Sequence, residues 1–271
     1  MRKFPILLLA VAFVSACASF NARHRTASSA YAFLYPDEAG KIEQPGIAEI
    51  KLPARVGIAF VPESDGNFAQ YRSTTITEIE KHRLLRRVAD AFKDREYIHS
   101  IEIIPSSYLR PKGGFANLDQ LATMYDIDII ALVAYDQVQT TDQDVAAFTY
   151  WTLIGAYVVP GEKNTTTVML DTVVYDIASR RMLLRAPGVG EVKGRSTPIN
   201  QGEQLRLDAI EATTQAAQQM IGNLEIELDA FRQKVRERPD DYRIVTGGGS
   251  GGGGGTVLLM LAPLLLAARL R

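Results

Sequence analysis

The chain is apolar at both ends, and this restricts the folded domain to the sequence between them. Residues 1–16 begin with two basic side chains and continue into an uncharged run from Phe4 to Phe13. That run is too short to span a membrane and has the length of the apolar part of a secretory signal. Near the other end, Thr256 to Ala268 is again uncharged and mostly aliphatic, and it is also shorter than the roughly 20 residues of a span. We expect the fold to lie between these two runs.

The N-terminal run ends in Val14-Ser15-Ala16-Cys17, which resembles the bacterial lipobox of one apolar residue, two small residues and a cysteine. The resemblance implies cleavage between Ala16 and Cys17, a diacylglycerol on the Cys17 thiol and a further acyl chain on the new amino group. Each buried methylene contributes about 0.8 kcal/mol, so three chains would make anchoring effectively permanent. Cys17 is the only cysteine, which excludes an intrachain disulfide, and a buried free thiol is the alternative. Ala18 stands where an aspartate would resemble an inner-membrane retention signal, which favours the outer membrane.

Glycines fill residues 247–255, interrupted only by Ser250, and the chain closes on two arginines after the second apolar run. This order resembles the GlyGly-CTERM sorting signal, which is recognised by rhombosortases, the rhomboid-type intramembrane serine proteases. A helix loses about 1 kcal/mol per glycine and about 3 kcal/mol per proline, so such a tail can unwind into a protease. The residues matched to recognition and cleavage are Gly247, Gly248, Gly249, Ser250, Gly251, Pro263, Arg269 and Arg271. A permanent C-terminal anchor and an artificial linker are the alternatives.

Between the two ends, the composition is that of one mildly acidic domain. Removing both ends takes away four of the 30 basic residues and none of the 31 acidic ones, which leaves a net charge of −5. This charge argues against nucleic-acid binding, and 46% hydrophobic residues is ordinary for a globular domain. The predicted divisions are a lipoprotein signal peptide at 1–16, a tether at 17–47, an α/β domain at 48–238, a Gly-rich linker at 239–255 and a hydrophobic sorting tail at 256–271. We expect the aromatic cluster of the tether, 31–35, to pack on the domain, with partner binding as the alternative.

The apolar pattern of the middle predicts alternating strands and helices, followed by strands alone. Apolar runs indicate buried strands and helical periodicity indicates the helices between them. The predicted order begins with strand 55–62, helix 75–95 and strand 98–106. A helix that is capped by Asn117 and ends near Tyr125 follows, and then strand 127–139. After these come a hairpin of strands 150–159 and 165–175 around the turn 160–164, and strand 181–193 with a bend at Pro187-Gly188. We therefore predict a single α/β domain whose sheet is mixed, parallel early and antiparallel late. Its order is similar to the TolB N-terminal domain and CsgG-like lipoproteins, an analogy of fold that carries no function.

A long amphipathic helix is predicted at the C-terminal end of the domain. Apolar residues recur at steps of three and four from Ile210 to Val235. Asn200 and Glu203 resemble a capping box with asparagine in place of serine or threonine, and Pro239 follows the last turn. We expect the apolar stripe to pack on the sheet, and a partner-binding coiled coil is the alternative.

No constellation of catalytic or metal-binding residues stands out in the sequence. The three histidines, His24, His82 and His99, are scattered and lack the spacing of a metal site. The pairs Asp126/Asp128 and Asp142/Asp144 lack the glycine and terminal glutamate of a calcium loop. Gly188-Val189-Gly190 opens no helix, and the G-x-S-x-G match at residues 248–252 lies in a glycine run rather than between a strand and a helix. We predict a protein that is not an enzyme and that needs no metal or cofactor.

Together, the lipobox at Cys17, the glycine tract from Gly247 and the apolar tail with its basic end are similar to the rhombotarget lipoproteins. Segments 135–137, 150–152 and 155–157 look like core segments of that family. The resemblance implies processing by the lipoprotein machinery, cleavage of the tail by a rhombosortase, and insertion in the inner membrane facing the periplasm before transfer to the outer membrane or cell surface. The mature domain is then expected to be a non-catalytic binding or accessory module of envelope assembly or secretion. An envelope hydrolase with a non-obvious site is the alternative.

Overall fold

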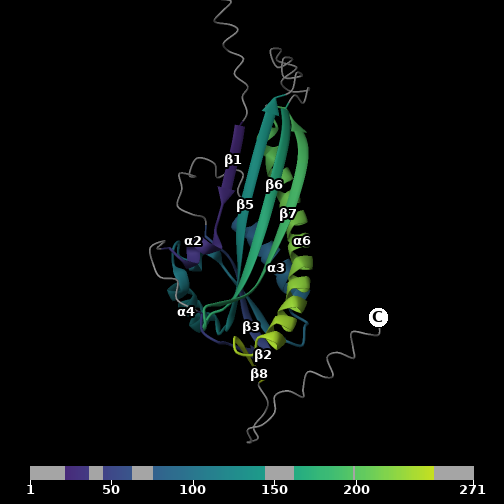
Figure 1. Ribbon diagram of the computed structural model, residues 1–271. Coiled ribbons are helices and arrows are strands. Elements are labelled where there is room, and N and C mark those ends of the chain that lie inside the picture. The colour runs from purple at the N-terminus through teal and green to yellow at the C-terminus, as the bar shows by residue number, and fades with distance from the viewer. Residues whose placement is uncertain (1–21, 37–44, 63–75, 144–161, 198, 247–271) are drawn as a thin grey trace, which may run out of the picture.

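Strands from distant parts of the chain build one six-stranded mixed sheet in the computed structural model (Figure 1). The structure describes residues 22–36, 45–62, 76–143, 162–197 and 199–246. The strands of this sheet are β1 (Ala22–Ala27), β3 (Ala54–Phe60), β4 (Ile98–Ile104), β5 (Ile129–Gln143), β6 (Glu162–Asp176) and β7 (Arg181–Ser196). β3 pairs in parallel with β4 and β5, whereas β5, β6 and β7 pair antiparallel in that order.

β5 connects a short parallel half of the sheet to a long antiparallel half. One edge of β5 pairs with β3 over Ile129–Val133 and then with β1 over Asp136–Thr141, while β6 runs along the whole of the other edge. The sheet therefore extends well beyond the ends of β3 and β4 (Figure 1). We call the end where β1 begins, β5 ends and β6 begins the distal end, and the end where β5 begins the proximal end.

Helices cover the two faces of the sheet unequally. On one face lie α3 (Glu78–Phe92) and α6 (Gln201–Glu237), and on the other lie α2 (Ala30–Leu34), the 3-10 helix η2 (Ser106–Tyr108) and α4 (Gly114–Tyr125). Ile58 and Phe60 of β3 pack toward α3 and α6, whereas Ala59 packs toward α2 and α4. A strand covered on both faces explains why its sequence is a continuous apolar run.

A second, two-stranded sheet closes the proximal end. It consists of β2 (Ala48–Leu52) and β8 (Tyr242–Thr246), which pair in parallel. Tyr242 is buried, and its ring meets that of Phe231 in α6 edge to face at 5.4 Å. The last described strand is therefore part of the core at the end of the domain opposite to the start of β1 (Figure 1).

The predicted fold class is confirmed: the chain forms a single α/β domain with a mixed sheet and a long C-terminal helix. Its limits are wider than predicted. The predicted tether contains β1 and α2, and the predicted Gly-rich linker contains β8. Both assignments were wrong at these residues because short strands and a five-residue helix carry little periodicity of their own and are stabilised by distant partners.

The aromatic cluster of the predicted tether packs on the domain, as expected. Phe33 and Leu34 are 3% and 4% exposed in the core beside α4. The ring of Tyr35 lies 5.8 Å from that of Phe115, which lies 5.7 Å from that of Tyr175. Burial, and the neighbouring Tyr35 hydroxyl, raise the pKa of Tyr175 to about 12. This N-terminal segment is therefore part of the fold.

Two predicted helix caps were wrong in their chemistry. Asn117 does not cap α4, which begins three residues earlier; its buried Oδ1 instead accepts a hydrogen bond from the Arg110 N–H at 2.8 Å. Asn200 stands at the N-cap of α6 but makes no side-chain cap, since its Oδ1 accepts from the Thr197 N–H at 2.7 Å. The Glu203 carboxylate accepts a hydrogen bond from Arg206 rather than from the backbone N–H of Asn200.

The predicted hairpin differs in its turn. Glu162, Lys163 and Asn164, which the turn 160–164 includes, belong to β6. Among the described strands, β6 pairs with β5 on one side and with β7 on the other. The predicted strand 150–159 lies outside the described residues. Pro187 and Gly188, where a bend is predicted, lie within β7 and cause no shift in the β6–β7 register, whose one shift falls between Val174 and Tyr175. Among the helices that the structure describes, none is both long and apolar enough to cross a membrane.

Candidate functional site

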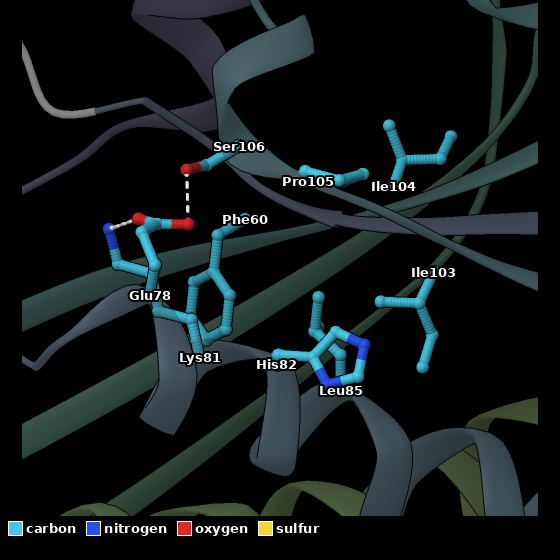
Figure 2. Close-up of a pocket in the computed structure, with 9 residues that line it drawn as sticks. All are labelled: Phe60, Glu78, Lys81, His82, Leu85, Ile103, Ile104, Pro105 and Ser106. Atoms are coloured by element: carbon cyan, nitrogen blue, oxygen red, sulfur yellow. Dashed lines mark hydrogen bonds and ion pairs between the residues drawn. The ribbon is translucent and has the colours of Figure 1, made fainter.

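A small hollow lies where the first turns of α3 meet the end of β4 (Figure 2). Its volume is about 120 Å³. Its lining residues are Phe60 from β3, Glu78, Lys81, His82 and Leu85 from α3, and Ile103, Ile104, Pro105 and Ser106 from the end of β4 and the start of η2. The capping box of Thr77 and Glu80 fixes the start of α3 and so fixes the polar side of the hollow.

Glu78 is the centre of the polar contacts in this hollow. Its carboxylate accepts hydrogen bonds from Lys81 Nζ at 2.8 Å and from Ser106 Oγ at 2.7 Å, as the dashed lines in Figure 2 show. Burial acts to raise the pKa of Glu78, but the hydrogen bonds from Lys81 and Ser106 outweigh it and the pKa is lowered. Glu78 is therefore an ionised carboxylate that ties α3 to η2.

The size of the hollow bears on what it can hold. Pockets for small-molecule ligands typically enclose roughly 300–1,000 Å³. At about 120 Å³ this hollow falls below that range. His82 lies on its exposed helical side, so the hollow offers an ionised carboxylate, a hydroxyl and an imidazole around an apolar floor of Phe60 and Leu85.

The first aspartate pair considered as calcium ligands serves a different role. Arg55 on β3 donates to Asp126 and to both oxygens of Asp128, at 2.9 and 3.0 Å for Asp128, and Lys51 donates to Asp128 at 3.1 Å. The Arg55 hydrogen bond lowers the pKa of Asp128 against the opposing effect of burial, and Lys51 lowers it further. These charges hold the turn before β5 against β2 and β3. In the second pair, Asp142 is exposed and lies opposite Lys163, while Asp144 lies outside the described residues.

The histidines do not come together in the described structure. His24 is in β1, His82 in α3 and His99 is exposed on β4. Over residues 22–36, 45–62, 76–143, 162–197 and 199–246, no three His, Cys, Asp or Glu side chains lie close enough to hold a metal ion.

One face of the distal half of the sheet is covered by none of the helices that the structure describes, and we call it the open face. α2 and α4 lie against the proximal half, and α6 packs on the opposite face (Figure 1). Alternate residues of β6 and β7 point outward and are half-buried or exposed, including Met169 at 37% and Val189 at 48%. The outward-facing residues are Asp136, Val138, Thr140 and Asp142 of β5, Lys163, Thr165, Thr167, Met169 and Asp171 of β6, and Arg185, Pro187, Val189, Glu191, Lys193 and Arg195 of β7.

Behind the open face, the contact between the distal sheet and α6 is unusually polar. Gln139 Nε2 donates to the Leu205 carbonyl at 2.9 Å, and Asn164 bridges Thr141 at 3.1 Å and Ser196 at 2.9 Å. These side chains are buried on three neighbouring strands. Each such group would cost about 1–3 kcal/mol if left without a partner, so the hydrogen bonds specify how the distal strands register against the helix.

Asp208 of α6 belongs to this polar layer. It is 3% exposed, its Oδ1 accepts from Gln204 Nε2 at 2.8 Å, and its Oδ2 has no hydrogen-bond partner. Burial raises the pKa of Asp208 against the effect of the Gln204 hydrogen bond, and the nearby charge of Glu211 raises it further. Nothing in the sequence marks Asp208 as buried, because an aspartate inside an amphipathic helix normally faces solvent.

The glycines of Gly188-Val189-Gly190 let α6 lie directly on β7. A Cβ at Gly190 would be 2.0 Å from the Ala212 carbonyl oxygen, and one at Gly188 would be 2.1 Å from that of Ala216. Both glycines face the helix while Val189 faces outward. A signal for this close contact is present in the sequence: glycines occupy alternate positions of the strand, and alanines lie four residues apart on the helix.

The residues predicted for lipidation and tail cleavage lie outside the described residues. These are Ala16 and Cys17 at the N-terminal end and the set from Gly247 to Arg271 at the other. The described strands approach both: β1 begins at Ala22 and β8 ends at Thr246. In the sequence, all predicted processing residues therefore lie before the first or after the last described strand.

No known protein family and no curated protein matches this chain. Sixteen chains of solved structures do match it. A PelC dodecamer from Paraburkholderia phytofirmans is 11% identical, with 64% of this chain and 99% of that chain covered and a TM-score of 0.25. A homolog of a neuraminyllactose-binding hemagglutinin from Helicobacter pylori is 8% identical, covers 73% and 96% of the two chains, and has a TM-score of 0.36. The hypothetical protein CT253 from Chlamydia trachomatis is 12% identical, covers 66% and 98%, and has a TM-score of 0.31. TM-scores this low carry no argument about function.

Proposed function

We propose that this protein is a bacterial envelope lipoprotein, acylated on Cys17 and released from its C-terminal tail by a rhombosortase. One observation carries the proposal: in the sequence, the two segments that resemble processing signals lie before the first described strand and after the last one. Cys17 precedes the first residue of β1 by five residues, and Gly247 follows the last residue of β8 directly. Cleavage at both signals would therefore leave every described strand and helix intact.

The mature domain is, in this proposal, a non-catalytic binding or accessory module of envelope assembly or secretion. The open face supports a binding role, because it offers a broad surface of threonines, paired charges and the exposed side chains of Met169 and Val189. The hollow beside α3 supports it too, since about 120 Å³ is small for a substrate. The outer membrane is the proposed destination, because Ala18 does not provide the aspartate of a retention signal.

The test is the intact mass of the protein purified from its native membrane, with and without the host rhombosortase. We expect an acylated chain that begins at Cys17, and an end within residues 247–255 only when the protease is present. A tail of unchanged mass in both strains would overturn the proposed cleavage, and the outer-membrane assignment with it.

A pair of variants tests the lipid anchor separately. Cys17→Ser should move the tail-processed protein from the membrane fraction to the soluble fraction, because the acylated thiol is lost. Ala18→Ser, one residue further on, should leave it in the membrane. Retention of Cys17→Ser in the membrane, in protein whose mass shows that both the signal peptide and the tail have been removed, would contradict lipid anchoring at this residue.

The proposal also orders the two processing steps. Both attachments begin in the inner membrane, and lipoprotein extraction acts on acyl chains rather than on a membrane-inserted segment. Tail removal should therefore precede transfer to the outer membrane. Finding the uncleaved protein in outer-membrane fractions of a strain that lacks the rhombosortase would contradict this order.

A further inference from the structure

The register of β1 fixes which end of the domain lies next to the lipid anchor. β1 pairs antiparallel with β5, and its first residue, Ala22, lies opposite Thr141, two residues before β5 ends. The chain therefore enters the fold at the distal end and runs toward the proximal end (Figure 1). If the chain entered the fold at the proximal end instead, the proximal end would lie next to the lipid anchor.

The length of chain before β1 limits how far this end can be from the lipid. Five residues lead from Cys17 to Ala22, and a fully extended chain spans at most about 3.6 Å per residue. The start of β1 therefore lies within about 18 Å of the acylated residue. Arg25 adds a rigid link, because its Nε and Nη2 donate to the two oxygens of Asp136 at 3.0 and 2.6 Å.

A row of charged residues crosses the open face at this end. Asp142, Lys163 and Arg195 are consecutive cross-strand partners on β5, β6 and β7, and all three are exposed. The row carries a net charge of +1, which is complementary in sign to the anionic head groups of phospholipids. In the sequence, no charged residue occurs between Val145 and Gly161, so most of the connection from β5 to β6 is uncharged.

We infer that the distal end of the sheet lies against the phospholipid bilayer that holds Cys17, with the row of Asp142, Lys163 and Arg195 at the level of the head groups. The contact surface is this row together with the first residues of β1. The proximal end then points away from the bilayer. The inference rests on the proposed acylation of Cys17 and goes beyond it, since an acylated tether by itself does not set the orientation of the domain.

Two lysines lie near the distal and the proximal end of the domain, so labels at these positions can measure how far each end is from the bilayer. Lys163 lies opposite Asp142, while Lys51 Nζ contacts Asp128 at 3.1 Å at the beginning of β5. Asp128 and Asp142 are 14 residues apart along the same strand direction, which corresponds to about 45 Å. Both lysines lie on strands and are exposed, so they form a matched pair.

The experiment uses the acylated, tail-processed protein in vesicles of phosphatidylethanolamine and phosphatidylglycerol that contain a head-group-labelled acceptor lipid. Lys163→Cys and Lys51→Cys each provide one thiol for a fluorescent donor, because the native cysteine is acylated. Lys193→Cys, on the neighbouring strand, is a second distal position in case Lys163→Cys misfolds. We expect the energy transfer to the lipid from either distal label to exceed that from the Lys51 label several-fold.

The outcomes separate the inference from the proposed function. Equal transfer from the distal and Lys51 labels, or stronger transfer from Lys51, in a protein whose mass shows acylated Cys17 would overturn the orientation and leave the lipoprotein assignment standing. A mass without acyl chains on Cys17 would overturn both.

Discussion

The carboxylate of Asp208 is buried, with one hydrogen-bond partner and almost no contact with solvent. Burial disfavours its charged form, so its pKa is raised in the folded protein. The unfolded chain then loses the proton at lower pH than the folded one. As a result, the contribution of Asp208 to the stability of the fold is greatest below the ordinary aspartate pKa and is lost as pH rises through the folded pKa.

Replacing this side chain should therefore stabilise the domain. Asp208→Asn removes the charge while keeping a polar group of the same size, and we expect it to raise the free energy of unfolding by about 1 kcal/mol at neutral pH. The difference in the free energy of unfolding between Asp208→Asn and the native protein should shrink as pH falls toward 3.8, the ordinary pKa of aspartate. Urea denaturation at several pH values measures it. Glu237→Gln, exposed in the last turn of α6, is the control and should change little; a less stable Asp208→Asn at neutral pH would contradict the prediction.

Phe33 tests whether the N-terminal segment belongs to the fold. It is 3% exposed, so Phe33→Ala should lower the free energy of unfolding by about 3 kcal/mol through lost burial and the cavity left behind. Tyr31→Ala, two residues earlier and 55% exposed, is the matched control and should have a small effect. Chemical denaturation measures both. Equal and small effects would show that this segment is only a tether.

At the scale of elements, the contact between α6 and β7 depends on the absence of side chains. Gly190→Ala would place a Cβ 2.0 Å from the Ala212 carbonyl oxygen, so the helix must move away from the strand. We expect a loss of about 1–3 kcal/mol, as for other overpacked cores. Gly222→Ala, on α6 with nothing within 4 Å of its Cβ, should instead stabilise by about 1 kcal/mol through helix propensity. Opposite signs in thermal unfolding are the expected result; a neutral Gly190→Ala would show that the close contact is absent.

The elements differ in how far the sequence predicts them. β3 and β5 were predictable because strands covered on both faces are continuous apolar runs, and α6 because its stripe recurs over many turns. β1 was not, since Arg23, His24 and Arg25 show no apolar alternation and the strand exists through its pairing with β5. The capping box at Thr77 and Glu80 is a local signature that was available in the sequence and was not predicted.

The candidate sites were predictable only in part. The segments that resemble a lipobox and a sorting tail are local motifs, so the sequence alone suggests them. The open face and the polar layer behind it arise from residues of β5, β6 and β7 that are brought side by side by register. The close approach of Gly190 to Ala212 depends on a helix that begins after the strand ends. Such contacts join residues of separate segments, so the spacing of residues within one segment does not predict them.

At the scale of the whole molecule, the domain boundary at Thr246 can be tested by truncation. Two chains that start at Ala18 should be compared, one ending at Thr246 and one ending at Arg238. The first should unfold at the same temperature as the chain ending at Gly255, because it keeps β8 and buried Tyr242. The second should unfold at a lower temperature, since the proximal core loses that side chain and its contact with Phe231. Equal melting of both truncated chains would place β8 outside the stable domain.

The two termini of the described fold lie at opposite ends of its long axis, with β1 starting at the distal end and β8 finishing at the proximal end (Figure 1). α6 alone, with 37 residues, measures about 55 Å along this axis. In our proposal Cys17 is acylated and the tail is inserted in the same membrane, so both ends of this long domain would be attached to one surface. The domain would then be held along the inner membrane until the tail is cut. Cleavage of the tail would free the proximal end, so one proteolytic event would allow the domain to stand on the membrane and would expose its long sides.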